Sequence, residues 1–242
     1  SQGQAQEALS ASETLIKDHP KTSLLYNISG ACYQELGQLE AAVKCYKQAL
    51  VIKPNYAEAH SNLGVTLQEL GQLEAAAKSY EQALAIKPDY ADAHSNLGVT
   101  LQELGQLDAA VKSYEKALAI KPDYAEAHSN LGNTLKELGQ LDAAVKSYEQ
   151  ALAIKPDYAE AHSNLGNTLK ELGQLDAAVK SYEQALAIKP DYAEAHSNLG
   201  NTLKELGQLE AAVKSYEQAL AIKPDYAEAH SNLGNTLKEL GQ

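Results

Sequence analysis

Asparagine recurs at a fixed interval along most of this chain, and its side chain has the chemistry to bind a peptide main chain. The carboxamide offers an acceptor oxygen and two N–H donors, although inside a helix it is less favourable than alanine by roughly half a kcal/mol. A regularly spaced set therefore predicts pairing with the N–H and C=O groups of an extended polypeptide. The alternative is a solvated helix face that duplication has copied. The main series, spaced by 34 residues, is Asn62, Asn96, Asn130, Asn164, Asn198 and Asn232, and the second series is Asn133, Asn167, Asn201 and Asn235.

Lysine accompanies the second asparagine series. The lysines that follow it three residues later are Lys136, Lys170, Lys204 and Lys238. The second and third repeats carry valine and glutamine at these two positions, as in Val65 and Gln68, and Ile28 takes the place of the main-series asparagine in the first repeat. The C-terminal half is therefore the expected site for a polar or acidic peptide, and the N-terminal half is the more apolar one.

Proline marks the period that positions these side chains. The seven prolines lie 34 residues apart, from Pro20 to Pro224. A fixed period of this size indicates a repeat array, and residues 159–192 represent one repeat. The expected organisation is the second helix of a partial repeat at 1–22, six full repeats at 23–226, and the first helix of a further repeat at 227–242, forming one continuous solenoid.

Each repeat predicts two helices. The first runs from about Ala159 to Leu172 and ends at Gly173 in the left-handed conformation, and the second begins near Asp176 and stops before Pro190. The apolar stripe of the first helix is His162, Leu165, Leu169 and Leu172, and the buried face of the second is Leu175, Ala178, Val179, Tyr182, Ala185, Leu186 and Ile188. One hairpin cannot bury its own apolar face, so the expected fold is an all-α solenoid of stacked antiparallel hairpins.

Three further details of the repeat carry expectations. Gly166 and Ala178 are small enough to let the two helices of a hairpin approach closely. Asp191 and Glu194 have the spacing of a capping box at the start of the next helix. The repeat histidines, such as His162, lie on the apolar stripe one per repeat, so we expect packed core residues and no metal site. No asymmetric group of catalytic side chains interrupts the repeats, so neither an enzyme nor a cofactor is expected.

The landmarks of the repeat resemble those of the tetratricopeptide repeat. They are Leu165, Gly166, Ala178, Tyr182, Ala185 and Pro190, within a period of 34 residues. The resemblance implies a right-handed superhelical α-solenoid that binds protein segments without catalysis. The segment AEAHSNLGNTLKELGQL is similar to the repeats that precede the catalytic domain of the O-linked N-acetylglucosamine transferases. That likeness implies a groove in which the asparagines from Asn62 to Asn232 grip extended polypeptide.

Charge and composition exclude several partners. The net charge is −12 with 20 lysines and no arginine, which argues against binding to nucleic acid or to an anionic membrane surface. No stretch approaches 18 continuous apolar residues, so no membrane span is expected. The N-terminus has no apolar run and is not expected to be a signal peptide. Two cysteines in one repeat, Cys32 and Cys45, favour free thiols and an intracellular, cytoplasmic protein.

The near-identity of the repeats within residues 125–226 supports a second hypothesis. An engineered or recently amplified array with no evolved ligand would have the same sequence pattern. Such a chain is expected to be a monomer in dilute solution. Its exposed terminal helices would stack head to tail at high concentration, with the stripe of Leu233 and Leu237 docking on Leu9 and Leu15 of another copy.

Overall fold

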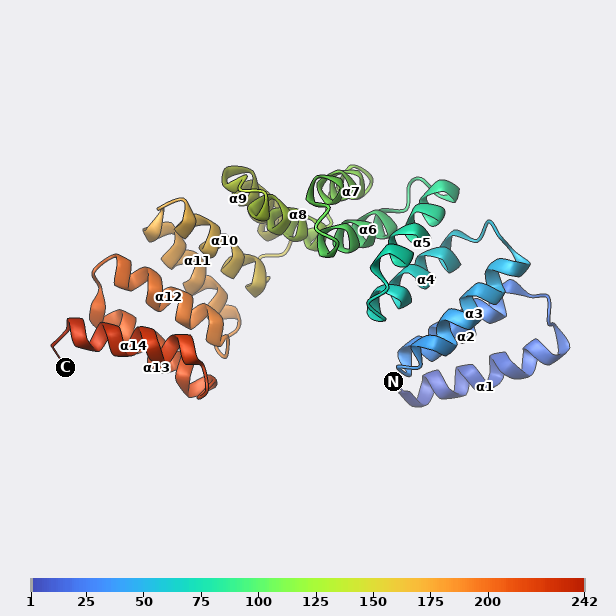
Figure 1. Cartoon of the computed structure of the whole chain (residues 1–242), viewed down its shortest axis with the longest axis horizontal. Coiled ribbons are helices and arrows are strands. Elements are labelled where there is room, and N and C mark those ends of the chain that lie inside the picture. The colour runs from blue at the N-terminus through green and yellow to red at the C-terminus, as the bar shows by residue number, and fades with distance from the viewer. Residues whose placement is uncertain (1, 242) are drawn as a thin grey trace. The chain divides into compact units, whose positions relative to one another are not determined.

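The computed structural model describes residues 2–241, and within them all regular structure is helical (Figure 1). The helices are α1 (Gln2–Asp18), α2 (Ser23–Glu35), α3 (Leu39–Ile52), α4 (Ala57–Glu69), α5 (Leu73–Ile86), α6 (Ala91–Glu103), α7 (Leu107–Ile120), α8 (Ala125–Glu137), α9 (Leu141–Ile154), α10 (Ala159–Glu171), α11 (Leu175–Ile188), α12 (Ala193–Glu205), α13 (Leu209–Ile222) and α14 (Ala227–Glu239). The prediction of an all-α chain of paired helices is confirmed, and the helix bounds predicted for residues 159–192 are right to within a residue.

The helices form two compact units, Ser1–Pro122 and Asp123–Gln242. Unit 1 contains the hairpins α2–α3, α4–α5 and α6–α7, and α1 packs against α2. Unit 2 contains the hairpins α8–α9, α10–α11 and α12–α13, and α14 packs against α13. Within each unit, the second helix of a hairpin also packs against the first helix of the next hairpin. Each repeat is thereby covered by its neighbours, as expected for stacked hairpins.

A left-handed glycine ends the first helix of each hairpin, as predicted. Gly173 has φ +72°, a backbone conformation that costs glycine little because it has no Cβ. Its N–H donates to the carbonyl of Lys170 at 2.9 Å, and the N–H of Gln174 donates to the carbonyl of Leu169 at 2.9 Å. These two bonds are a Schellman motif, which satisfies carbonyls that the helix end would otherwise leave unpaired.

The predicted capping box at the start of the first helix is wrong. Helix α12 begins at Ala193 with Tyr192 as its N-cap and no side-chain cap hydrogen bond, so Asp191 lies one residue too early to cap. The loop is held instead by Lys189, whose Nζ lies 4.7 Å from the centroid of the Tyr192 ring. Glu194 still stabilises the helix, because an acidic residue in the first turn interacts favourably with the helix dipole.

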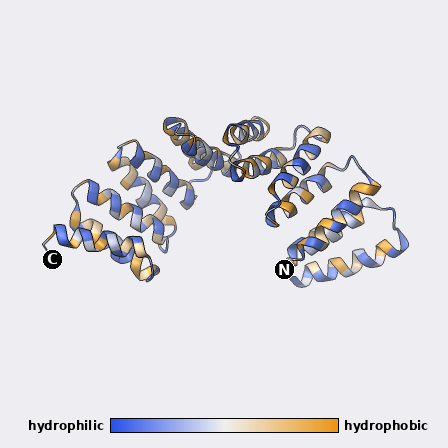
Figure 2. Cartoon of the chain, viewed as in Figure 1, coloured by the Kyte–Doolittle hydropathy of each residue, from blue (hydrophilic) through white to orange (hydrophobic). Residues whose placement is uncertain are grey.

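The core of each repeat is built around one tyrosine and the glycine that faces it. Tyr182 and Ala178 are both 0% exposed, and a Cβ placed on Gly166 would lie only 2.8 Å from Cε1 of the Tyr182 ring. The predicted close approach at Gly166 is therefore confirmed, and it depends on the absence of a side chain there. Hydrophobic and hydrophilic residues are interspersed along the helices (Figure 2), and hydrophobic residues at helical spacing form the side that packs into this core.

Two predictions about the apolar residues need correction. Ile188 was expected in the core, but its side chain is 38% exposed because it ends the second helix on the outer side of the hairpin. His162 was expected as a packed core residue but is only half-buried. Its Nε2 lies 3.0 Å from the carbonyl oxygen of Pro156, so it ties the first helix to the preceding loop. The equivalent bond is 2.9 Å for His60, 3.0 Å for His94 and His196, and 2.8 Å for His230.

Candidate functional site

The asparagines and lysines of unit 2 lie on one side of its first helices. On α10, Asn164, Asn167 and Lys170 are spaced by three residues, which places them along one face of the helix. All three side chains are half-buried. Helices α8 and α12 repeat the arrangement, and on α14 Asn232 is half-buried whereas Asn235 and Lys238 are exposed. The structure therefore brings these predicted residues together within unit 2.

Each second-series asparagine is the centre of an internal hydrogen-bond network. The Oδ1 atom of Asn167 accepts from the hydroxyl of Tyr182 at 2.7 Å and from Nδ2 of Asn198 at 3.0 Å. One oxygen therefore joins the second helix of its own repeat to the first helix of the next repeat. Asn133 accepts the same two bonds from Tyr148 and Asn164. Asn201 accepts them from Tyr216 and Asn232.

The network keeps the tyrosine hydroxyl as a donor. Burial, the largest cause, raises the pKa of Tyr182 above its ordinary value, and the nearby carboxylates of Glu171 and Glu205 raise it further. The hydroxyl stays protonated at neutral pH and needs an acceptor, because an unpaired buried polar group is costly. Asn167 supplies that acceptor, so the second series has a structural role that the sequence analysis did not anticipate.

The main series retains unused hydrogen-bonding capacity. Asn198 donates one N–H to Asn167, which leaves its second N–H and its carbonyl oxygen. Among the described residues, no internal partner takes either group of Asn164 or Asn198. One internal bond thus fixes the side chain, while an acceptor and a donor remain for a ligand.

The lysines of unit 2 are paired with glutamates of the next repeat. Lys170 Nζ lies 3.0 Å from Oε1 of Glu205, and the pairs Lys136–Glu171 and Lys204–Glu239 measure 2.9 and 2.8 Å. The Lys170 side chain is 27% exposed and that of Glu205 is 50% exposed. Solvent-accessible pairs of this kind contribute little to stability, so an acidic ligand has to compete with the glutamate but faces only a small penalty.

A pocket opens at this network. Its volume is about 450 Å³, and its lining combines both asparagine series with two of the ion pairs. The lining residues are Lys136, Asn167, Lys170, Glu171, Asn198 and Glu205. Two lysines and two glutamates make the formal charge of the lining zero, so the pocket suits polar main-chain groups better than a highly charged ligand.

In unit 1 a different residue accepts the hydrogen bond from the equivalent tyrosine hydroxyl. Gln68 Oε1 accepts from the hydroxyl of Tyr80 at 3.4 Å and from Oγ1 of Thr100 at 3.1 Å, and its Nε2 donates to Glu103 at 3.1 Å. Valine at position 65 cannot accept a hydrogen bond, so the glutamine does so. In the main series of unit 1, Asn62 donates to Asn27 at 3.2 Å, and Asn62 and Asn96 are both half-buried.

The buried tyrosine hydroxyl can thus find its acceptor in two ways. One is a valine followed three residues later by glutamine, and the other is an asparagine followed three residues later by lysine. In unit 1 the glutamine accepts from tyrosine and donates to glutamate. In unit 2 the asparagine accepts from tyrosine, which frees the next position for a lysine that pairs with the same glutamate. The two positions change together along the sequence, and this joint change was the available signal for the network.

Replacing Asn167 with valine should destabilise the protein, and adding Lys170→Gln should restore part of the loss. The single change removes the acceptor of Tyr182, with an expected cost of about 1–3 kcal/mol. The double variant recreates the valine–glutamine pair of unit 1, so we expect coupling between the sites of about 1 kcal/mol in chemical denaturation. Lys170→Gln alone is the control, and strictly additive effects would contradict the two-solution account.

Among residues 2–241, no group of three His, Cys, Asp or Glu side chains is arranged to hold a metal ion. Across the same residues, no helix has the length and apolar character needed to cross a bilayer. Cys32 and Cys45 are free thiols.

The helix pairs, their period and their packing place the chain in a known family. The model of the TPR (tetratricopeptide) repeat matches residues 30–71, 66–105, 101–139, 132–173, 166–207 and 200–241. The chain belongs to the TPR repeat family, whose members are typically protein-binding scaffolds. No curated protein sequence matches the chain.

Solved structures with the same fold include several TPR proteins. A chain of the APC/C hetero-tetramer Cut9–Hcn1 is 18% identical with a TM-score of 0.76, and the match covers 97% of this chain and 46% of that one. The present chain thus spans about half the length of that protein. PilF of Pseudomonas aeruginosa is 20% identical with a TM-score of 0.74, over 96% of this chain and 99% of that one. YrrB, a TPR protein with an unusual peptide-binding site, is 24% identical with a TM-score of 0.66, over 78% of this chain and 97% of that one.

Proposed function

We propose that this chain is a non-catalytic scaffold that binds an extended polypeptide along the first helices of unit 2. The proposal rests on the burial and the hydrogen bonding of the main-series asparagines. Asn164 and Asn198 are half-buried, each is fixed by one N–H bond to the preceding repeat, and each keeps an acceptor and a donor. A peptide unit needs one partner for its C=O and one for its N–H, so each asparagine matches one peptide unit.

The other predicted residues take supporting roles in this proposal. The second series holds the main series in place, because Asn133, Asn167 and Asn201 accept its N–H groups. Lys136, Lys170 and Lys204 favour acidic side chains of the ligand in exchange for their glutamate partners. The sequence likeness to the repeats of O-linked N-acetylglucosamine transferases and the fold shared with the peptide-binding YrrB both support this assignment.

Replacing amides of a bound peptide with esters tests whether the main chain is what the protein recognises. A peptide is first selected from a random library on immobilised protein, and ester analogues are then compared with scrambled versions of the same peptide. Each ester removes one N–H donor and should weaken binding by about 0.5–1.5 kcal/mol in titration calorimetry. Scrambling the side chains should have a smaller effect. The proposal fails if scrambling abolishes binding while the esters bind as well as the parent.

The second candidate is a structural repeat array without an evolved ligand. The internal network favours this candidate in one respect. The second-series asparagines accept the tyrosine hydroxyls, and this role accounts for their presence without any ligand. In this reading the 242-residue chain would associate only with itself, through the half-buried Leu233 and Leu237 of α14 and the exposed Leu15 of α1. Failure to retain any library peptide would support this candidate.

A further inference from the structure

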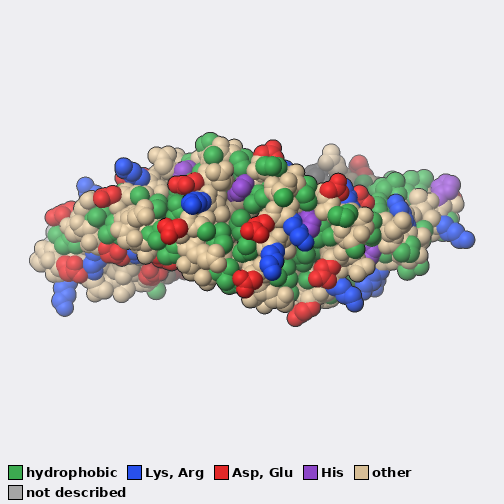
Figure 3. Space-filling view, turned by 90° about the horizontal axis from the view of Figure 1, so that it is seen from above, with side chains coloured by type: hydrophobic (Ala, Val, Ile, Leu, Met, Phe, Trp, Pro, Cys, Tyr) green, Lys and Arg blue, Asp and Glu red, His purple; other side chains and the backbone are tan. Residues whose placement is uncertain are grey.

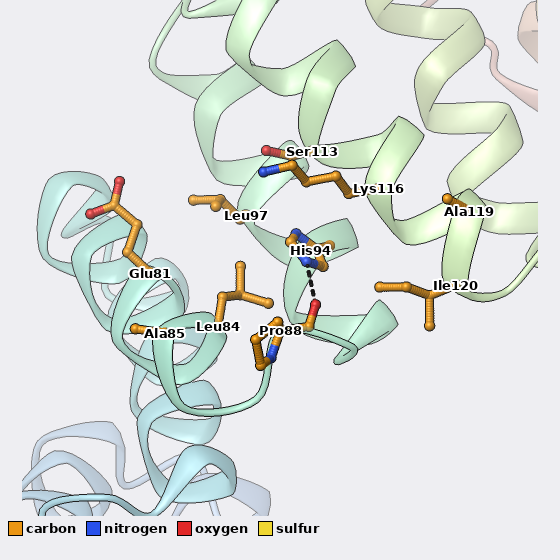
Figure 4. Close-up of a pocket in the computed structure, with 10 residues that line it drawn as sticks. All are labelled: Glu81, Leu84, Ala85, Pro88, His94, Leu97, Ser113, Lys116, Ala119 and Ile120. Atoms are coloured by element: carbon orange, nitrogen blue, oxygen red, sulfur yellow. Dashed lines mark hydrogen bonds between the residues drawn. The ribbon is translucent and has the colours of Figure 1, made fainter.

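We propose that unit 1 carries a second binding site, on the side formed by its second helices, for a polypeptide segment that presents large apolar side chains next to carboxylates. The site is the groove between α5 and α7, with α6 as its floor (Figure 4). Its volume is about 660 Å³. It is separate from the asparagine surface, and the inference does not depend on the function proposed above.

The groove is apolar within and charged at its edges. Leu84 of α5, Leu97 of α6 and Ile120 of α7 line it, and the Ile120 side chain is 39% exposed. Glu81 stands on one wall and Lys116 on the other. Figure 4 shows Lys116 extending from α7 over Leu97 and His94, whereas Glu81 lies on α5 with its carboxylate turned away from the floor. An apolar side chain entering the groove would therefore pass close to the lysine.

His94 makes a fixed and uncharged floor. It is the most buried of the repeat histidines, at 7% exposed, and its Nε2 lies 3.0 Å from the carbonyl oxygen of Pro88. Burial, the largest cause, lowers the pKa of His94; the hydrogen bond with the Pro88 carbonyl opposes this shift, and the charge of Lys116 adds to it. The floor therefore offers apolar contact without a positive charge of its own, so Lys116 is the one cationic residue of the lining.

Two departures from the repeat single out this side of unit 1. Lys116 stands where the other second helices from α5 onward have glutamine, such as Gln184. Lys47 stands on α3 where the later second helices have glutamate, such as Glu81. Lys47 lines the neighbouring groove, of about 430 Å³, between α3 and α5. Both departures add positive charge, and they line the two grooves that flank α5.

Unpaired lysines at the edges of the two grooves identify the occupant. Charged groups of both signs are interspersed on the face shown in Figure 3, so these lysines act locally against the chain's net charge of −12. Among the described residues, neither Lys47 nor Lys116 takes part in an ion pair, and both are exposed. Grooves with apolar floors and unpaired lysines at their edges complement an acidic segment with leucine-like side chains, one for each groove. A helix or an extended strand of that chemistry can lie across α5.

This side of α6 is distinct from the side that carries the asparagine series. Adjacent helical residues are rotated by about 100°, so Asn96 points about 200° away from His94 around the helix axis. A ligand in the groove therefore leaves Asn96 uncovered. The main-series asparagines of unit 2 lie on α8, α10, α12 and α14 and belong to the other compact unit.

The test uses a labelled amphipathic peptide with leucine at every third or fourth position and glutamate beside each leucine, together with a twin in which lysine replaces glutamate. Fluorescence anisotropy on the full chain at low salt should give tighter binding of the glutamate peptide. Lys116→Gln should weaken that binding about threefold to fivefold, and high salt should remove the difference. The variant restores the residue used by neighbouring repeats, so it should fold as the parent does.

The reverse substitution is the matched gain-of-function control. Gln184 of α11 occupies the position of Lys116 in a repeat that has the same apolar residues at the equivalent positions, so Gln184→Lys should tighten binding of the glutamate peptide at that repeat by a similar factor. Alanine at Asn130, Asn164 and Asn198 should leave this binding unchanged, which separates the site from the asparagine surface. Equal binding of the two peptides, an unaffected Lys116→Gln variant, or an unaffected Gln184→Lys variant would overturn the proposal. So would Lys116-dependent association with phosphatidylglycerol vesicles or between copies of the chain in place of peptide binding.

Discussion

Replacing Gly132 and Gly166 with alanine together is expected to destabilise unit 2 by roughly 2–4 kcal/mol. A Cβ at these positions would lie 2.7 Å and 2.8 Å from Cε1 of Tyr148 and Tyr182. Neither ring can move aside, because both are 0% exposed and their hydroxyls are bonded to Asn133 and Asn167 at 2.7 Å. The overpacking exceeds the gain of about 0.5–1 kcal/mol that alanine normally brings to a helix interior. Chemical denaturation followed by circular dichroism measures the change.

Gly234 provides a matched control in the same sequence context. It occupies the same position of its helix as Gly166, but a Cβ placed on it meets no atom within 4 Å. Gly234→Ala should therefore leave stability unchanged or raise it by up to about 1 kcal/mol. Gly166→Ala combined with Tyr182→Leu should lose less than the sum of the single changes, because the smaller side chain makes room. Equal losses from Gly166→Ala and Gly234→Ala would mean that the tyrosine contact is not the cause.

Alanine at Asn130, Asn164 and Asn198 together should weaken a bound extended peptide by roughly 2–4 kcal/mol. The change removes three amide groups that are each matched to one peptide unit. It also removes two internal bonds, from Asn164 to Asn133 and from Asn198 to Asn167. Alanine is the better helix former, so the gain in helix propensity offsets much of that loss. We expect the free energy of unfolding to change by less than about 1 kcal/mol, measured alongside titration calorimetry with the library-selected peptide.

The control removes three amides from another part of the same repeats. Gln150, Gln184 and Gln218 are exposed on the second helices α9, α11 and α13. Their replacement with alanine should leave peptide affinity unchanged. If the asparagine variant binds as tightly as the parent, the main series is a solvated helix face and the peptide-binding proposal is wrong.

The helices were predictable because several independent sequence signals mark their ends in each repeat. Gly173 and Pro190 mark the helix ends in every copy, and the apolar spacing identifies the sides that pack. The cap of the first helix was mispredicted because Asp191 and Glu194 have the spacing of a capping box, although the N-cap is Tyr192. Spacing alone does not report which residue first adopts helical backbone angles, and here the loop from Lys189 to Tyr192 decides it.

The shared helix face of the candidate residues was predictable from their spacing, but their internal bonds were not. Helical spacing places Asn164 and Asn167 on one face, and both were expected to face a ligand. The sequence does not reveal that Asn167 accepts from Tyr182, because that bond spans two helices of the hairpin. The pairing of Lys170 with Glu205 likewise spans two repeats. Contacts of this kind depend on how neighbouring helices are rotated against each other, which residue spacing within one helix does not determine.

The two ways of satisfying the core tyrosine have a consequence for how the gene can change. Both solutions pair with a glutamate of the following repeat, such as Glu103 or Glu205, and this glutamate is present in every repeat from the second onward. Either kind of repeat can therefore precede any such repeat and keep this pairing with the glutamate. Unequal recombination that gains or loses whole 34-residue segments would keep this contact at each junction. Copy number, and with it the number of asparagines offered to a ligand, can then drift without passing through an unstable intermediate.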